Sequence, residues 1–170
     1  MQKHFHCLVI VAGIFCTVPT SLADSSSLVP RTAIQADYNH IYTAARHKDL
    51  SSAMRYFSTD FMSEDAVNTP GNKTPSMNLA QLRQVAADYA GASQSIRGYA
   101  VVQRLIISGN QATATVVHHV IIVGTPDTKT GKRFHYVFNT TTQDIWIQGS
   151  QGWRMQRGRG LSLRVERHES

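Results

Sequence analysis

The sequence predicts a single α+β domain in which three N-terminal helices precede an antiparallel β-sheet. Apolar residues recur with a helical period as far as Gly91 and with a period of two after it. The strand-like segments follow one another through short turns containing glycine, which favours an antiparallel meander. The chain has 170 residues, of which 42% are hydrophobic and 16% charged, as expected for one globular domain with its own core.

The first 23 residues have the pattern of a secretory signal peptide. Lys3 supplies a positive charge, residues 8–18 form an apolar run, and Pro19 ends it before Ala23, a small residue at a cleavage position. An apolar run this short cannot span a hydrocarbon core that needs about 20 residues. We therefore expect an exported protein, periplasmic or secreted, with no stable membrane anchor after cleavage.

Cysteine usage and charge limit the chemistry of the exported part. Cys7 and Cys16 are the two cysteines and both lie in the predicted signal peptide, so no disulfide, thiol nucleophile or thiolate metal site is expected. The formal net charge is +6, but export and the lack of a base-stacking motif argue against nucleic acid. We expect neither a metal nor a cofactor.

Capping patterns place the predicted helices. Residues 24–31 are expected to be a flexible leader, and Thr32 with Gln35 forms a capping box for a helix ending near Arg46. A short second helix follows, and residues 63–77 are expected to be a loop because they contain two prolines and a glycine. The second and third helices are predicted to start at Asp49 and Asn78.

The predicted strands are apolar on both faces. A sheet with one face in water alternates apolar and polar residues, whereas residues 120–123 and 145–147 are continuously apolar. The helices can cover one face, so we expect a homodimer to cover the outer face of the sheet. The predicted strands are residues 99–108, 112–123, 134–148 and 153–157.

The order of the elements and four short motifs resemble the nuclear transport factor 2-like superfamily, which includes SnoaL-like cyclases and ketosteroid isomerases. The motifs are Lys48-Asp49-Leu50, Tyr56-Phe57, Asp144-Ile145-Trp146 and Gly152-Trp153-Arg154. The resemblance implies a strongly curved sheet wrapped around the first helix, a cystatin-like cone with an apolar pocket. The domain would span residues 32–160, and residues 161–170 would form a basic tail. Many members dimerise through the outer sheet face.

The same resemblance implies two candidate catalytic carboxylates. Asp65 falls near the general base of ketosteroid isomerases, and Asp144 falls where that family has a protonated aspartate that donates a hydrogen bond. The family's tyrosine donor falls at Ile41, so Tyr38 and Tyr42 are expected to point elsewhere. The alternatives are that Asp65 is a solvated loop residue and that Asp144 pairs with Arg154 or a strand amide.

The expected ligand pocket lies between the first helix and the sheet. Adjacent strand residues point to opposite faces, so only one of His118 and His119 can line the pocket, and we expect His119. Aromatic rings with polar tips suit an apolar or aromatic ligand. The expected lining residues are Tyr38, Tyr42, Phe57, Phe61, His119 and Trp146.

Three functions remain open from the sequence. The first is non-catalytic binding of a small apolar molecule in the pocket. The second is a lyase or isomerase that uses Asp65 and Asp144. The third is a protein-interaction module of the cell envelope that uses the sheet face and the basic C-terminal stretch, which could also meet an anionic partner.

Overall fold

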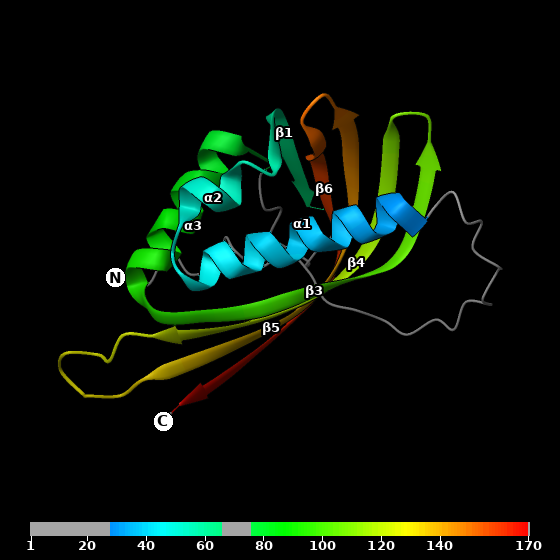
Figure 1. Ribbon diagram of the computed structural model, residues 1–170. Helices are drawn as coiled ribbons and strands as arrows, with labels where there is room; N and C mark the ends of the chain where they lie inside the picture. Colours follow the sequence, from blue (N-terminus) through cyan, green and yellow to red (C-terminus); the bar gives the residue numbers. More distant parts are fainter. Residues whose placement is uncertain (1–27, 66–75, 170) are drawn as a thin grey trace.

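The computed structural model describes residues 28–65 and 76–169, and shows three helices packed against a six-stranded sheet (Figure 1). The helices are α1 (Leu28–Arg46), α2 (Leu50–Met54) and α3 (Leu79–Ala92). The strands are β1 (Phe57–Asp65), β2 (Met77–Asn78), β3 (Ser93–Ser108), β4 (Gln111–Gly124), β5 (Phe134–Gly149) and β6 (Gly152–Glu169). The predicted α+β class is therefore confirmed, with the helices before the main strands.

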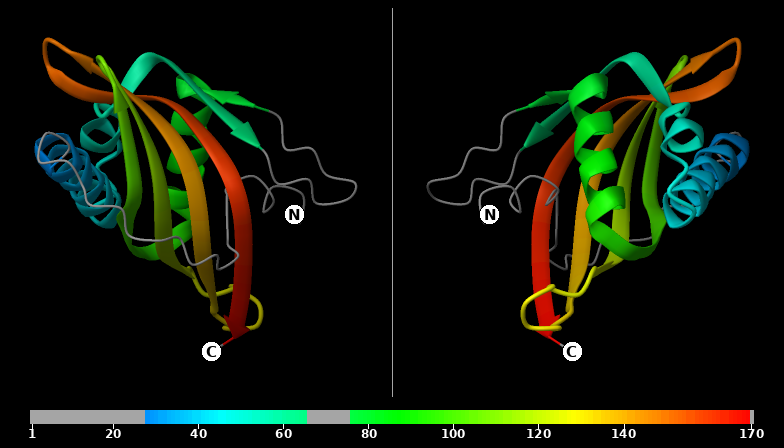
Figure 2. Two further views of the ribbon diagram at one scale, coloured as in Figure 1. Left: turned by 90° about the vertical axis from the view of Figure 1, so that its right-hand side faces the viewer. Right: turned by 90° about the vertical axis from the view of Figure 1, so that its left-hand side faces the viewer.

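Strands β3 to β6 form the predicted antiparallel meander. The spatial order is β2-β1-β6-β5-β4-β3, so these four strands are neighbours in chain order. Gly109 lies in the turn after β3, and Gly152 begins β6 directly after the turn that follows β5; their φ angles of 59° and 91° favour glycine. All four strands bend together along their length (Figure 2), and α1 crosses them on the inner side of the bend (Figure 1).

The sheet is mixed rather than antiparallel throughout, because β1 pairs in parallel with β6. This strand was not predicted from the sequence. Phe57 and Phe61 are four residues apart, a spacing that fits one face of a helix or of a strand, and the residues between them include three polar ones. The expected loop over 63–77 is wrong at both ends, where Ser63 pairs with Met77, and residues 66–75 lie outside the described part.

Helix α1 begins at Leu28, so the predicted start at Thr32 and its capping box are wrong. Gln35 instead binds the exposed edge of the sheet: its Nε2 donates to Ala100 O at 2.8 Å, and Val102 N donates to its Oε1 at 2.9 Å. Edge strands carry unpaired backbone groups, and β3 is such an edge. This side chain therefore fixes α1 along β3. Asn78 caps α3 as predicted, and it forms a capping box with Gln81.

Strand β6 continues to Glu169, so the expected end of the last strand at Arg157 is wrong. Its register with β5 runs from Gly149↔Gly152 to Phe134↔Glu169. The stretch expected to be a basic tail, 161–170, therefore belongs to the sheet as far as Glu169. The predicted leader, 24–31, is helical from Leu28, and the predicted signal peptide lies outside the described residues.

The hydrophobic core fills one end of the space between the helices and the concave face of the sheet, and the other end holds a cavity. Small residues on β3 and β4, among them Ala112 and Ala114, let the first half of α1 approach the sheet closely around Ile34. Trp146 closes this packed end from β5. The cavity lies on the other side, toward the second half of α1.

No helix within residues 28–65 and 76–169 is both long and apolar enough to cross a membrane.

Candidate functional site

A cavity of about 310 Å³ lies between the second half of α1, helix α3 and the curved sheet. Most of its wall is apolar, and residues 38, 41, 42 and 45 of α1 all line it because a helix repeats every 3.6 residues. Further apolar lining residues are Leu50, Phe57, Phe61, Met77, Leu82, Ala86, Ala90, Ile96, Val120, Ile122, Phe138 and Met155. A molecule of ten to fifteen heavy atoms is of the right order for this space.

Asp144 is the acidic group of the cavity wall. Asp144 lies on β5 and is only 2% exposed. Its Oδ2 accepts hydrogen bonds from the hydroxyl of Tyr38 and from Thr142 Oγ1, the latter at 2.8 Å. Burial raises the pKa of Asp144 from 3.8 to about 7, and these two hydrogen bonds oppose the shift by favouring the carboxylate. This carboxyl group therefore changes charge near neutral pH.

His118 joins a second tyrosine to the same carboxyl group. Its Nδ1 lies 2.9 Å from the hydroxyl of Tyr42, and its Nε2 lies 2.9 Å from Thr142 Oγ1. Burial lowers the pKa of His118 to about 4, so the imidazole is neutral at physiological pH. We call Tyr38, Tyr42, His118, Thr142 and Asp144 the Asp144 cluster.

Two glycines border this arrangement, and one of them is required by it. A Cβ atom at Gly98 on β3 would lie 2.8 Å from Tyr42 Cε1 and 2.8 Å from His119 O, so only glycine lets the Tyr42 ring lie against the strand. A Cβ atom at Gly158 on β6 would lie 3.5 Å from Asp144 Oδ1 and 3.8 Å from the Phe61 ring. These are ordinary van der Waals distances, so Gly158 borders the carboxyl group and the cavity without being required by them.

The structure brings four of the six expected pocket residues to the cavity wall: Tyr38, Tyr42, Phe57 and Phe61. Trp146 lies behind that wall, where its Nε1 donates to the Tyr38 hydroxyl at 3.3 Å. Both Tyr38 and Tyr42 face the cavity beside Ile41, so the expectation that they point elsewhere is wrong.

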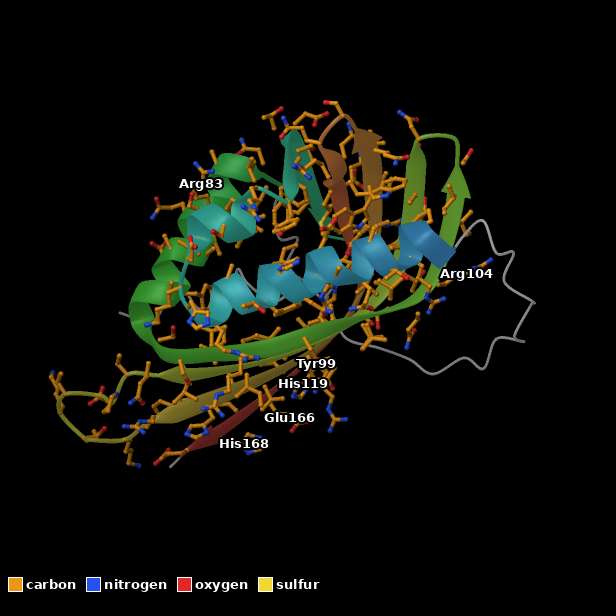
Figure 3. The ribbon with its side chains drawn as sticks, in the orientation of Figure 1. Arg83, Tyr99, Arg104, His119, Glu166 and His168 are labelled. Carbon is orange, nitrogen blue, oxygen red and sulfur yellow. The ribbon has the colours of Figure 1, made fainter. Side chains whose placement is uncertain are left out.

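His119 lies on the opposite face of the sheet, so the expectation that it lines the pocket is wrong. Its Nδ1 lies 2.7 Å from Asn139 Oδ1, and its ring is 5.4 Å from that of Tyr99. Figure 3 shows His119 and Tyr99 pointing away from α1. His118 has the inward orientation instead, because Asp144 and Thr142 share one parity on β5 and Thr140 pairs with His118.

The structure describes the surroundings of one candidate carboxylate, Asp144, but not those of the other, Asp65. Asp144 is not paired with Arg154, whose Nη1 donates to the backbone oxygen of Trp153 at 2.8 Å. The backbone of Asp65 pairs with Gly160, but its side chain lies outside the described part. Within residues 28–65 and 76–169, no group of three His, Cys, Asp or Glu side chains is placed to hold a metal ion.

Sequence reasoning missed His118, Thr142, Gly98 and Gly158. The pairing of β4 with β5, in which Ala114 lies opposite Asp144, identifies His118 and Thr142 as inward-pointing residues. Once Asp144 is taken to point inward, every second residue on β5 and its partners on β4 must point inward as well. The two glycines carry no such signal, because their role depends on a helix and a side chain from distant parts of the chain.

Comparison with known proteins gives the fold its name. No protein-family model matches the sequence, and no curated protein matches it. Solved structures do match. A nuclear transport factor 2-like superfamily protein from Salmonella enterica has a TM-score of 0.55 and 13% identity, with 85% of this chain and 92% of that chain covered. The chain has the nuclear transport factor 2-like fold.

Other solved structures have higher TM-scores to this chain. A conserved protein from Planctomyces limnophilus has a TM-score of 0.66 and 14% identity, covering 81% of this chain and 98% of that chain. A protein from Novosphingobium aromaticivorans, whose proposed activity is that of a scytalone dehydratase, has a TM-score of 0.65 and 12% identity, covering 85% and 89%. A hexachlorocyclohexane dehydrochlorinase matches as well. The nuclear transport factor 2-like fold therefore carries several activities and selects none.

Proposed function

We propose that the protein binds a small, largely apolar molecule in the cavity, with one polar group of the ligand placed against the Asp144 cluster. The observation that carries this proposal is an apolar cavity of about 310 Å³ whose acidic group is a buried carboxyl. Pockets of this kind combine apolar walls with a few polar groups that orient the ligand.

The buried carboxyl supports a ligand site over a structural role. Placing an acid in an apolar site raises its pKa and costs folding free energy whenever it ionises. An amide or an apolar residue could fill the position of Asp144 without that cost. Perturbed titratable groups in a cavity are therefore typical of sites that act on a ligand.

The experiment measures binding of 2-naphthalenemethanol by isothermal titration calorimetry. The variant Ala86→Leu fills the cavity from α3, and the matched control Ala80→Leu adds the same side chain at an exposed position of that helix. We expect the wild type and Ala80→Leu to bind and Ala86→Leu to bind at least about tenfold more weakly, because the added side chain takes the ligand's space. Equal binding by all three proteins would place the ligand elsewhere.

Proton transfer at Asp144 is the second candidate function, and the raised pKa of its carboxyl group favours it. A group with a pKa of about 7 is populated both as acid and as base at neutral pH. As a base, Asp144 would take a proton from a carbon atom beside a carbonyl group, as an isomerase or lyase requires. Asp65 is the candidate second carboxylate from the sequence.

Deuterium exchange tests this candidate without knowledge of the substrate. The α-protons of 2-tetralone exchange with deuterated water when a base removes them, and proton NMR follows the loss of their signal. Catalysis predicts exchange that is faster with wild type than with Asp144→Asn. Equal rates for the two proteins would reject proton transfer at Asp144 while leaving ligand binding intact.

Export and a homodimer through the outer sheet face remain proposals from the sequence. Exposed apolar side chains on the outer face of β3 support the homodimer: Tyr99 is 55% exposed and Val101 is 46% exposed. His119, Glu166 and His168 project from the same face (Figure 3). Burying such a surface in a second copy would explain strands that are apolar on both faces.

A further inference from the structure

The direction of each hydrogen bond in the Asp144 cluster limits what its ligand can be, and this inference rests on the proposed function. The ionised carboxylate of Asp144 can only accept hydrogen bonds. Tyr38 and Thr142 must therefore each donate their hydroxyl proton to Asp144 Oδ2. The indole of Trp146 can only donate, and its proton goes to the Tyr38 oxygen.

The imidazole tautomer follows from the same reasoning. Thr142 has one proton and gives it to Asp144, so His118 Nε2 must carry a proton and donate it to Thr142 Oγ1. A neutral imidazole with its proton on Nε2 has a bare Nδ1, which accepts. Tyr42 must then donate its hydroxyl proton to His118 Nδ1. These contacts form one chain of donors that ends at Asp144, and Trp146 and Tyr38 form a second.

The cluster therefore presents only lone pairs to the cavity while Asp144 is ionised. Its three hydroxyl protons and its imidazole proton all point at other members of the cluster. Nearby, Ser63 also uses its hydroxyl proton, which it donates to Met77 O at 3.4 Å. Thr140 and Tyr89 line the cavity outside the cluster. A ligand group that meets the cluster must supply the proton itself.

The charges around the cavity point to a cation. The groups that face Asp144 are Tyr38 and Tyr42 from α1, His118 from β4, Phe61 from β1 and Gly158 from β6. Two of these are neutral phenols, and the imidazole is also neutral. No lysine, arginine or glutamate is among the described residues that line the cavity. His118 Nε2 lies 4.0 Å from Asp144 Oδ2, but this imidazole is neutral, so the negative charge of Asp144 has no positive partner among the described residues of the wall.

We infer that the cavity selects small aromatic or aliphatic amines, whose ammonium group donates to Asp144 and neutralises its charge. Hydrogen bonds between charged groups are the stronger ones, and a buried charge requires a partner. The aromatic rings of the wall can also face a cation favourably. The arrangement is the reverse of an oxyanion hole, which presents protons to a developing negative charge.

The test uses three probes of one shape that differ in a single polar group. They are 2-naphthalenemethylamine, 2-naphthalenemethanol and 2-naphthaldehyde, titrated calorimetrically into the full chain at pH 8, where Asp144 is mostly ionised. We expect the amine to bind more tightly than the alcohol and at least about tenfold more tightly than the aldehyde, which cannot donate. An aldehyde that binds as tightly as the amine would overturn this inference and leave the proposed function standing. Failure of all three to bind would overturn both.

A substitution assigns the preference to the carboxyl group. In Asp144→Asn the advantage of the amine over the alcohol should disappear. The matched control Asp37→Asn makes the same change on α1, at a half-buried aspartate outside the cavity lining whose neighbouring charges include Arg154 and Arg55. This control should retain the advantage. Loss of the advantage in both variants, or in neither, would show that Asp144 does not select the amine.

Proton release provides a readout that needs no variant. At pH 6 Asp144 is mostly protonated, so binding an ammonium group to its carboxylate should release close to one proton, whereas the aldehyde should release none. Calorimetry in buffers of different ionisation enthalpy measures this number. Amine binding without proton release at pH 6 would contradict the assignment of Asp144 as its partner.

Discussion

The buried carboxyl of Asp144 should make the free energy of unfolding depend on pH in a characteristic way. Its pKa rises from 3.8 in the unfolded chain to about 7 in the folded protein, because burial favours the neutral acid. The folded state therefore holds a proton that the unfolded state has already lost between these two values. Stability from this group is fully present below pH 4 and is lost as pH rises through about 7.

The size of the effect follows from the shift. Each pKa unit corresponds to about 1.4 kcal/mol, so the whole change is worth about 4 kcal/mol. Of this, about 3 kcal/mol should be lost between pH 5 and pH 8. Asp144→Asn cannot ionise, and its side-chain oxygen can still accept from Tyr38 and Thr142. The variant should therefore gain about 3 kcal/mol over the wild type between pH 5 and pH 8.

Urea unfolding followed by the fluorescence of Trp146 and Trp153 measures this difference. His118 contributes with the opposite sign, because its pKa is lowered to about 4 and the unfolded chain takes up its proton as pH falls. Burial alone lowers the pKa of His118, and Asp144→Asn leaves that burial in place, so the contribution largely cancels when one protein is subtracted from the other. A difference that stays flat from pH 5 to pH 8 would refute the claim that Asp144 ionises inside an apolar site.

Three further substitutions test the rest of the structure. Gly98→Ala should push the Tyr42 ring away and cost about 1–3 kcal/mol of unfolding free energy, whereas Gly91→Ala, with no atom within 4 Å of its new methyl, should cost nothing. Gln35→Leu should lower the free energy of unfolding by about 1–3 kcal/mol, because it removes two hydrogen bonds to the backbone of β3. An unchanged urea midpoint would contradict the role of Gln35 in fixing α1 to the sheet. Val101→Glu should convert a dimer to a monomer in light scattering, and Ala80→Glu on α3 should not; a wild-type monomer would end the dimer proposal.

The order of the elements could be predicted because it depends on local patterns. The change from helical to strand period at Gly91, the Asn78–Gln81 capping box and the turn glycines are all encoded within a few residues. Strand β1 could not be predicted in the same way. It is held by parallel pairing with β6, a strand almost a hundred residues later in the chain, and this pairing leaves little trace in its own sequence.

The site was predicted only in part, for a similar reason. Asp144, Tyr38 and Tyr42 were candidates, and helical spacing alone puts residues 38, 41, 42 and 45 on one face. The choice between His118 and His119 depends on the parity of β4. Residues 111–116 alternate polar and apolar, with Ala112, Ala114 and Val116 buried, and extending this alternation puts His118 inward. The apolar run that follows at residues 120–123 obscures the alternation. That parity is fixed by the register with β5, in which Ala114 lies opposite Asp144.

A crystal structure of the protein with 2-naphthalenemethylamine would show whether the cavity beside Asp144 holds a small molecule. We expect density for the naphthalene ring among Phe57, Phe61 and Phe138, with the amine nitrogen within hydrogen-bond distance of the Asp144 carboxylate. A cavity filled by the protein's own side chains, or a probe bound outside it with Asp144 untouched, would contradict the account.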